Sequence, residues 1–164
     1  LSQQVTLTGL GSKLFDTGVS NLKDLHSLFA RYFHGTEVTK ASAAVGDDVA
    51  IVASNRYLTT LEDDPNAVGI AFGRGVDPME SFKPHVGASY VHAAENVVEY
   101  FKASTDTATG RVKFTHVEAD PSSFRVGDVV EMQASVIAFR TQNKAVKLHY
   151  HLRALILISS AHSK

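Results

Sequence analysis

Residues 147–153 place four cationic or titratable side chains at every second position of one apolar segment. Lys147, His149, His151 and Arg153 alternate there with leucine and tyrosine. Because successive side chains of a strand point to opposite faces, these four would share one face of a sheet. Lysine, arginine and protonated histidine bind anions, and two histidines on one strand face can also ligate a metal ion. The pattern therefore indicates a solvated sheet face, an anion-binding face or a metal site.

An anion-binding face is the first functional interpretation. Two further cations lie in the turn before this strand, so the candidate binding residues are Arg140, Lys144, Lys147, His149, His151 and Arg153. A short barrel of the oligonucleotide-binding type would present the 140–153 face to nucleic acid, with the cations on phosphates. The exposed side of these strands lacks the aromatic platforms on which single-stranded bases stack, which weakens the nucleic-acid interpretation.

A metal site is the second functional interpretation, because His149 and His151 would share a strand face. Two ligands do not complete a site, and His116, in the alternating segment 111–118, is the one attractive third ligand. The chain has no cysteine, which excludes thiolate ligands, disulfides and cysteine nucleophiles. We expect no cofactor and assign no metal site, and a histidine–metal enzyme stays open as an alternative.

The same alternation predicts how the last two strands pair. Even-numbered residues are apolar in both runs: Val130, Met132, Ala134, Val136 and Ala138 in one, and Val146, Leu148, Tyr150, Leu152 and Ala154 in the other. Antiparallel pairing around the polar turn at 140–144 keeps both sets on one face, because a one-residue slip would turn a whole set outward. One such register places Glu131 opposite Arg153. We expect the cationic face to point away from this core and to be at least partly accessible.

Hydrophobic periodicity elsewhere predicts further elements. Apolar residues recur at three- and four-residue steps over 21–33 and again over 90–102, which indicates two amphipathic helices. Short apolar or alternating runs predict strands at 5–10, 49–54, 67–73 and 111–118, and a segment rich in glycine and proline at 73–87 predicts a loop.

These elements define an α+β fold class in one globular domain, residues 1–164. We expect an antiparallel β-sheet, barrel or sandwich of about six strands with two amphipathic helices packed on it. The side chains expected between helices and sheet are Leu25, Phe29, Phe33, Ala94, Val98 and Phe101. Replacing a buried Phe29 by Ala should cost ~3–5 kcal/mol.

Composition sets limits on the partners. Sixteen Lys and Arg against seventeen Asp and Glu give a net charge of −1, so no broad positive field collects nucleic acid and any such binding would be local. No apolar run reaches the length of a membrane span, so we expect no membrane partner. No asparagine lies in a glycosylation acceptor sequence, which favours an intracellular location, cytoplasmic or nuclear.

Catalytic signatures are missing from the sequence. There is no P-loop, no Gly-x-Ser-x-Gly and no His-Glu-x-x-His motif. The Gly-x-Gly at 73–75 follows an apolar run but lacks the third glycine and the helix of a dinucleotide site, so it indicates a turn. Whether the chain is an enzyme stays uncertain, and the sequence favours the negative answer.

One resemblance covers about residues 85–159. The segments VHAAENVVEYF and DPSSFRVGDVVEMQASVIAF, followed by LRALILI, resemble an uncharacterised domain found in many copies in mushroom-forming basidiomycete fungi. No activity is known for that domain, so the resemblance implies no catalytic residue. It implies an intracellular fungal protein from an expanded set.

These observations favour a non-enzymatic interaction module that binds a protein partner or self-associates. The sequence supplies the core patterns of a folded domain without a recognisable catalytic constellation. A nucleic-acid-binding module and a histidine–metal enzyme are the two alternatives.

Overall fold

The computed structural model describes residues 1–34, 36–39, 43–106 and 113–161. The chain divides into two compact units, each of which is described by itself. The helix unit comprises Gln4–Ser54 and Ala134–His151, and the pocket unit comprises Leu1–Gln3, Asn55–Gln133 and Leu152–Lys164. The single domain expected from the length stays a prediction.

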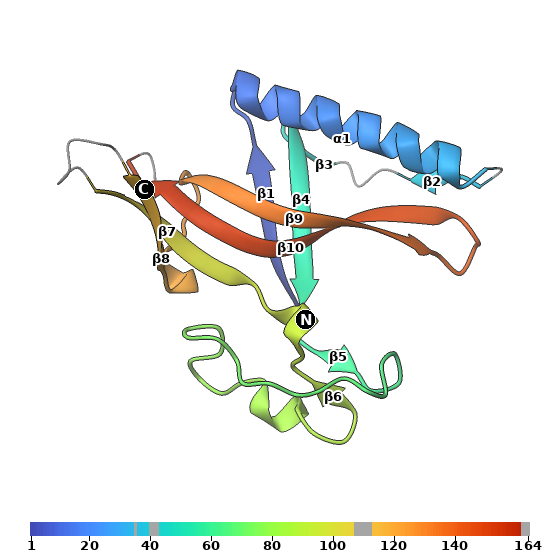
Figure 1. The fold of residues 1–164 in the computed structure, drawn as a ribbon, viewed down its shortest axis with the longest axis vertical. Helices are drawn as coiled ribbons and strands as arrows, with labels where there is room; N and C mark the ends of the chain where they lie inside the picture. Colours follow the sequence, from blue (N-terminus) through green and yellow to red (C-terminus); the bar gives the residue numbers. More distant parts are fainter. Residues whose placement is uncertain (35, 40–42, 107–112, 162–164) are drawn as a thin grey trace. The chain divides into compact units, whose positions relative to one another are not determined.

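The elements follow one another along the chain as Figure 1 labels them. The order is β1 (Ser2–Thr8), α1 (Lys13–Tyr32), β2 (Val38–Thr39), β3 (Ala43–Val45), β4 (Asp48–Arg56), β5 (Thr59–Thr60), η1 (Lys83–His85), β6 (Tyr90–Val91), η2 (Ala94–Asn96), β7 (Glu99–Asp106), β8 (Lys113–Glu118), η3 (Pro121–Ser123), β9 (Val129–Arg140) and β10 (Val146–Ser159). The three η elements are single 3-10 turns. The α+β class is confirmed.

The sheet is mixed, which corrects the expectation of an antiparallel sheet, barrel or sandwich. β10 pairs in parallel with β2, β4 and β7 in turn, at Val146, Tyr150 and Ala154 respectively. Antiparallel pairs join β3 to β4 and β7 to β8. Among the described residues the hydrogen-bonded order β1-β4-β10-β7-β8 has two different ends, so this sheet is not a closed barrel. The parallel neighbours of β10 come from segments far back in the chain, which periodicity within each segment could not reveal.

The expected terminal hairpin is present. β9 pairs with β10 across the turn at 141–145, and so short a connection requires antiparallel strands. Lys144 takes a left-handed conformation in this turn, with φ of 63°, and its backbone N–H donates to the Thr141 carbonyl. The register of the two strands stays a prediction.

Burial of the side chains along β10 follows the alternation of apolar and polar residues in its sequence. All even-numbered side chains from Val146 to Ile156 are buried, while Lys147 is exposed and the next three odd-numbered residues are half-buried. From Leu155 to Leu157 both faces are buried, as expected for a strand covered on two sides. Along β9 the even-numbered residues are half-buried except Ala134 and Arg140, which are exposed.

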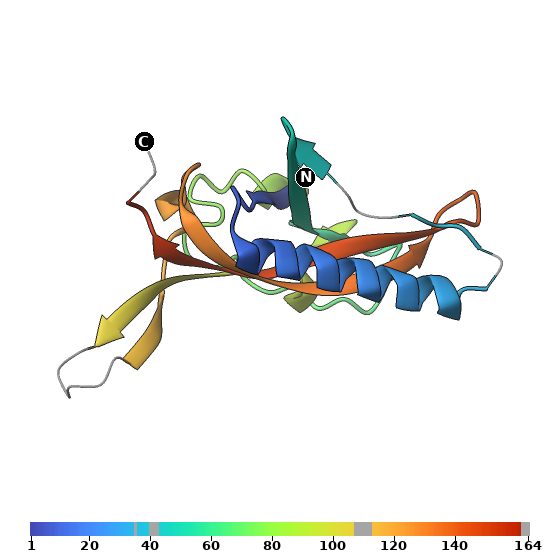
Figure 2. The same ribbon diagram turned by 90° about the horizontal axis from the view of Figure 1, so that it is seen from above.

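Only one of the two expected helices forms. α1 begins at Lys13, after Ser12, and is longer than the predicted segment 21–33. Its apolar face is half-buried at Leu25, Phe29 and Phe33, and none of its residues is fully buried. Within the helix unit, the ring nitrogen Nε2 of His26 bonds the Val38 carbonyl in β2 at 2.8 Å. Figure 2 shows α1 as one uninterrupted helix.

Residues 90–102 do not form the second predicted helix. They contain β6, the short turn η2 and the start of β7. The Asn96 side-chain oxygen accepts the Ala93 N–H at 2.8 Å and the Thr59 hydroxyl at 3.0 Å. Such local side-chain bonds compete with helical ones, and β-branched and aromatic residues then favour the strand that pairs with β10. Of the expected contacts here, Val98 is buried, Phe101 half-buried and Ala94 exposed.

The other predicted segments agree with the structure to different degrees. The predicted strand 67–73 is irregular chain, whereas the predicted strand 49–54 lies inside β4. The predicted strand 111–118 is observed as β8 from Lys113, and residues 111–112 lie outside the described residues. The segment 73–87 is a loop as expected, apart from η1.

Aromatic rings hold part of this irregular chain in the pocket unit. Phe82 lies against Tyr57, with ring centroids 4.5 Å apart, and Phe72 stacks on His92 at 4.2 Å. His92 is buried, and its Nδ1 bonds the Tyr57 carbonyl at 2.7 Å. The loop is therefore anchored by apolar contacts although it has no regular structure.

Candidate functional site

The six candidate binding residues do not belong to one unit. Arg140, Lys144 and Lys147 are exposed in the helix unit, where His149 and His151 are half-buried. Arg153 belongs to the pocket unit, and its guanidinium donates to the Glu95 carbonyl at 3.3 Å. The interpretation of all six as one binding face, for nucleic acid or protein, stays a prediction, as does the pairing of Glu131 with Arg153.

The two histidines of the predicted face have partners within their own unit. His149 Nε2 lies 3.0 Å from the Ser54 carbonyl oxygen, which makes the ring a link between β10 and β4. The rings of His149 and His151 are 6.0 Å apart and nearly perpendicular. His149 is therefore half-buried with a structural hydrogen bond.

The metal interpretation requires a third ligand. Within the described ranges, no three His, Asp or Glu side chains gather closely enough to hold a metal ion. His116, the proposed third ligand, stacks on Phe101 with ring centroids 5.9 Å apart.

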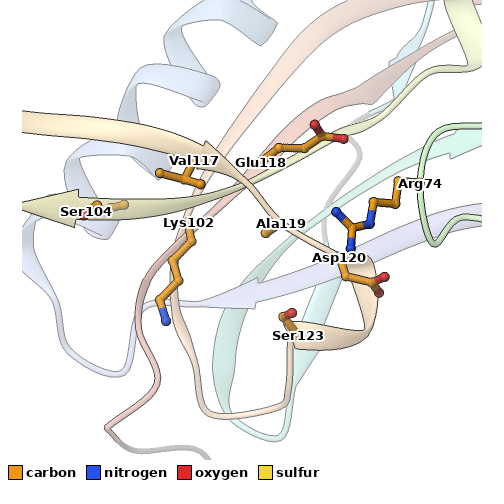
Figure 3. Close-up of a pocket in the computed structure, with 9 residues that line it drawn as sticks. Arg74, Lys102, Ser104, Val117, Glu118, Ala119, Asp120 and Ser123 are labelled. Atoms are coloured by element: carbon orange, nitrogen blue, oxygen red, sulfur yellow. The ribbon is translucent and has the colours of Figure 1, made fainter.

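A pocket of about 520 Å³ lies beside the β7–β8 hairpin in the pocket unit. Its walls come from β7, from the end of β8 with the following η3 turn, and from the 73–87 loop (Figure 3). The lining residues are Arg74, Lys102, Ala103, Ser104, Val117, Glu118, Ala119, Asp120 and Ser123. Two cations and two hydroxyls thus line a concave surface that the sequence did not single out.

The hairpin register explains which side chains share the pocket face. Lys102 lies opposite Val117, and Phe101 lies opposite Glu118. Opposed residues of an antiparallel pair point to the same face, and neighbours along a strand alternate. Lys102 and Val117 therefore share one face and Glu118 projects to the other, which agrees with the opposite directions of the Lys102 and Glu118 side chains in Figure 3.

Asp120 is already engaged by its surroundings. Asp120 is the N-cap residue of the η3 turn, and its Oδ1 accepts a hydrogen bond from the Ser122 N–H at 2.9 Å. Its carboxylate also lies against Gly75, where an added Cβ atom would clash with it. Hydrogen bonding from Ser122, with a smaller contribution from Arg74, lowers the pKa of Asp120. The group stays a carboxylate whose charge is partly compensated.

The two cations of the pocket have spare hydrogen-bonding capacity. Across the part of the chain that the structure describes, neither the Arg74 guanidinium nor the Lys102 ammonium makes a hydrogen bond or an ion pair within 4 Å. Arg74 feels the Asp120 charge only at longer range. Both cations are exposed, so an anion entering the pocket would meet donors that need not leave another partner.

β8 is the last strand of the order β1-β4-β10-β7-β8, and its residues Val117 and Glu118 line this pocket. The Ala119 N–H donates to the Tyr100 carbonyl at 2.9 Å, so this opposed pair is a hydrogen-bonded one. Because such pairs alternate along an antiparallel ladder, Val117 and Thr115 direct their backbone groups toward β7, and His116 and Glu118 direct theirs outward. In the described chain β8 pairs with no strand except β7, and the backbone groups of His116 and Glu118 form an open edge.

A second polar cluster in the pocket unit serves to hold the chain together. The buried Thr59 hydroxyl bonds the Glu95 carboxylate at 2.7 Å, and the Asn55 amide donates to the Glu95 and Leu152 carbonyls at 2.8 and 3.3 Å. Arg56 lies 3.5 Å from Glu95 and 3.0 Å from Asp63. Thr59 is fully buried, so it offers no accessible nucleophile, and the cluster joins β4, β5, η2 and β10.

Sequence reasoning missed the pocket because two of its walls were assigned to other structures. Lys102 fell within the predicted second helix, and Arg74 within a predicted turn. The alternation of Lys102 and Ser104 with Phe101 and Ala103 was the available signal for a strand with a polar face. Nothing in the sequence indicated that Arg74 comes close to Asp120.

No protein-family model matches this chain, and neither the curated proteins nor the solved structures include a significant match. The resemblance to the fungal domain therefore stays a prediction. No helix among the described residues combines the length and the apolar character that crossing a membrane requires.

Proposed function

We propose that this chain is a non-enzymatic interaction module that binds an extended segment of a protein partner along the outer edge of β8. The observation that carries the proposal is the edge at His116 and Glu118, which is open among the described residues, on a strand that lines a pocket whose two cations have no described hydrogen-bonded partner. An added strand gains main-chain hydrogen bonds from such an edge and specificity from an adjoining pocket.

The surroundings of β8 support the proposal. Val117 is 56% exposed on the pocket face, where it offers an apolar contact to a neighbouring strand. Exposed edges attract strands from other chains, and many proteins protect them with prolines, bulges or charges. β8 contains no proline, and the edge residue Glu118 carries a charge that limits indiscriminate pairing.

A library of displayed random nine-residue peptides, panned against the full chain, tests this function. We expect enriched peptides to bind the purified protein in fluorescence anisotropy, with binding lost in His116→Pro and retained in His116→Ala. Proline removes the outward N–H, whereas alanine keeps it, so the pair separates backbone pairing from a role of the imidazole.

Hydrogen exchange gives a second measurement on the unmodified chain. Peptide binding should slow exchange of the His116 and Glu118 amides and leave exchange in α1 unchanged. The proposal is wrong if no peptide enriches above a control without protein, if His116→Ala abolishes binding as fully as His116→Pro, or if these two amides gain no protection.

A further inference from the structure

The pocket beside β8 receives its two cations from two different segments of the chain. Arg74 approaches from the 73–87 loop and Lys102 from β7, and Figure 3 draws them on different sides of Ala119. The hydroxyl-bearing residue Ser123 completes the lower wall of the pocket in that view. Donors from three separate segments thus surround one space.

Among the described residues, the two carboxylates that line the pocket, Glu118 and Asp120, form no ion pair with Arg74 or Lys102 within 4 Å. Glu118 projects to the face opposite Lys102, as the register requires. Asp120 is bonded to the Ser122 N–H and packed on Gly75. Arg74 and Lys102 are therefore the two charged pocket residues with free donors, since neither has a hydrogen-bonded partner among the described residues.

A strand added to β8 would place one of its side chains at this space. The residue opposite Val117 would point to the face that Val117 and Lys102 share. Neighbouring strands lie about 4.8 Å apart, so this residue and Lys102 would be separated by two spacings, roughly 10 Å between backbones. An extended lysine stem and an acidic side chain together can close that separation.

We infer that the pocket recognises a carboxylate, so that the partner segment carries an aspartate or glutamate opposite Val117. Arg74 donates to the carboxylate from the loop, and Lys102 donates from β7. The inference rests on the proposed function for the presence of the segment, and on the pocket alone for its charge.

Two synthetic peptides test the charge. Both have nine residues of alternating threonine and valine, and the central residue is glutamate in one and glutamine in the other. At low salt we expect the glutamate peptide to bind about 5- to 20-fold more tightly, as charge-assisted hydrogen bonds allow, and the ratio to shrink at high salt.

Variants assign the effect to the pocket. Arg74→Gln and Lys102→Gln should each weaken binding of the glutamate peptide more than binding of the glutamine peptide, and so bring the affinity ratio toward one. Lys83→Gln is the matched control, because Lys83 is an exposed cation of the same unit that pairs with Glu80 at 2.7 Å. A third peptide with a central phosphoserine tests for a phosphate site. If the protein binds this peptide but not the glutamate peptide, the carboxylate assignment is wrong.

A titration with acetate separates this inference from the proposed function. In the wild-type protein, acetate should shift the Arg74 Nε–H resonance and leave the Lys83 side-chain resonance unchanged. Sodium chloride added in place of acetate is the control for ionic strength. Equal affinity for the glutamate and glutamine peptides, or no Arg74 shift with acetate beyond that of chloride, would overturn the inference and leave edge binding intact. An acetate shift without binding of any peptide would overturn the proposed function and leave an anion pocket.

Discussion

Tyr100 shows how one polar side chain depends on its surroundings in the pocket unit. Its hydroxyl donates to the Gln3 side-chain oxygen at 3.0 Å, and Gln3 in turn donates to the Asn96 carbonyl at 3.1 Å. Burial, with a smaller contribution from the charge of Tyr57, raises the pKa of Tyr100 to about 12. The neutral phenol is therefore part of the folded structure.

This pKa predicts a loss of stability in alkali. An unfolded tyrosine titrates near 10, so the folded state holds its proton more tightly and the stabilisation is fully present below pH 10. It is lost as the pH rises from 10 to 12. The free energy of unfolding should fall by roughly 1–2 kcal/mol across this window, which is less than 1.36 kcal/mol per unit of pKa difference because Tyr100 is partly exposed and solvent screens its charge.

Urea unfolding at pH 9, 10, 11 and 12 measures this loss, with Tyr100→Phe as the matched variant. Tyr57 and Tyr150 also have raised pKa values because of burial and titrate in both proteins, so only the difference between the two proteins reports Tyr100. Parallel pH profiles for wild type and Tyr100→Phe would contradict the prediction.

The helix α1 has no fully buried residue. Its apolar stripe is half-buried, and Leu14, Leu28 and Tyr32 expose more than half of their surface. Helices in proteins draw their stability mainly from the packing of such a stripe. α1 should therefore open more readily than β10, whose side chains between Leu152 and Leu157 are buried except Arg153.

The consequence for Phe29 differs from the sequence-based expectation. The ring stacks on Phe33 at 6.3 Å but keeps part of its surface in solvent. Phe29→Ala should cost about 1–2 kcal/mol, because the ~3–5 kcal/mol of a fully buried phenylalanine requires complete burial. Urea denaturation measures the cost, and Leu28→Ala on the exposed side should stay within about 0.5 kcal/mol. A loss above 3 kcal/mol for Phe29→Ala would mean that α1 is buried in solution.

The elements also show what periodicity can and cannot predict. Alternation located β9 and β10 and the buried set from Val146 to Ala154, because each strand carries that information in its own residues. The segment 90–102 was misread because Val97, Val98, Tyr100 and Phe101 fit both periods. Two bonds of Asn96 decide between them: the bond to Ala93 is local, but the bond to Thr59 joins residues 37 positions apart in sequence.

At the scale of the whole molecule, β10 supplies buried side chains to both units. Leu148 lies in the core of the helix unit and Ile156 in the core of the pocket unit, on one uninterrupted strand. The parallel pairings of β10 could not be predicted from the sequence, because β2, β4 and β7 carry no local signal of a parallel partner. The candidate pocket depended on the same long-range information, which is why only the cationic strand face was proposed beforehand.

The shared strand predicts cooperative unfolding. Leu148→Ala and Ile156→Ala should each cost about 2–5 kcal/mol and lower the midpoint of one and the same transition. Circular dichroism and tyrosine fluorescence, followed together during urea unfolding, measure this. Two separated transitions, with each substitution moving only one of them, would show that the units unfold independently.

The position of β10 in the strand order affects synthesis of the protein. β2, β4, β7 and β9 all precede β10 in the chain, and each pairs with it. On the ribosome these strands must wait, with open edges, until residues 146–157 have left the exit tunnel. The wait is on the order of several seconds at ~5–20 residues per second, long enough for unpaired edges to meet one another or a chaperone. Nascent chains stalled with residue 145 just outside the tunnel should therefore be cleaved by protease within β4, and chains extended past β10 should resist it.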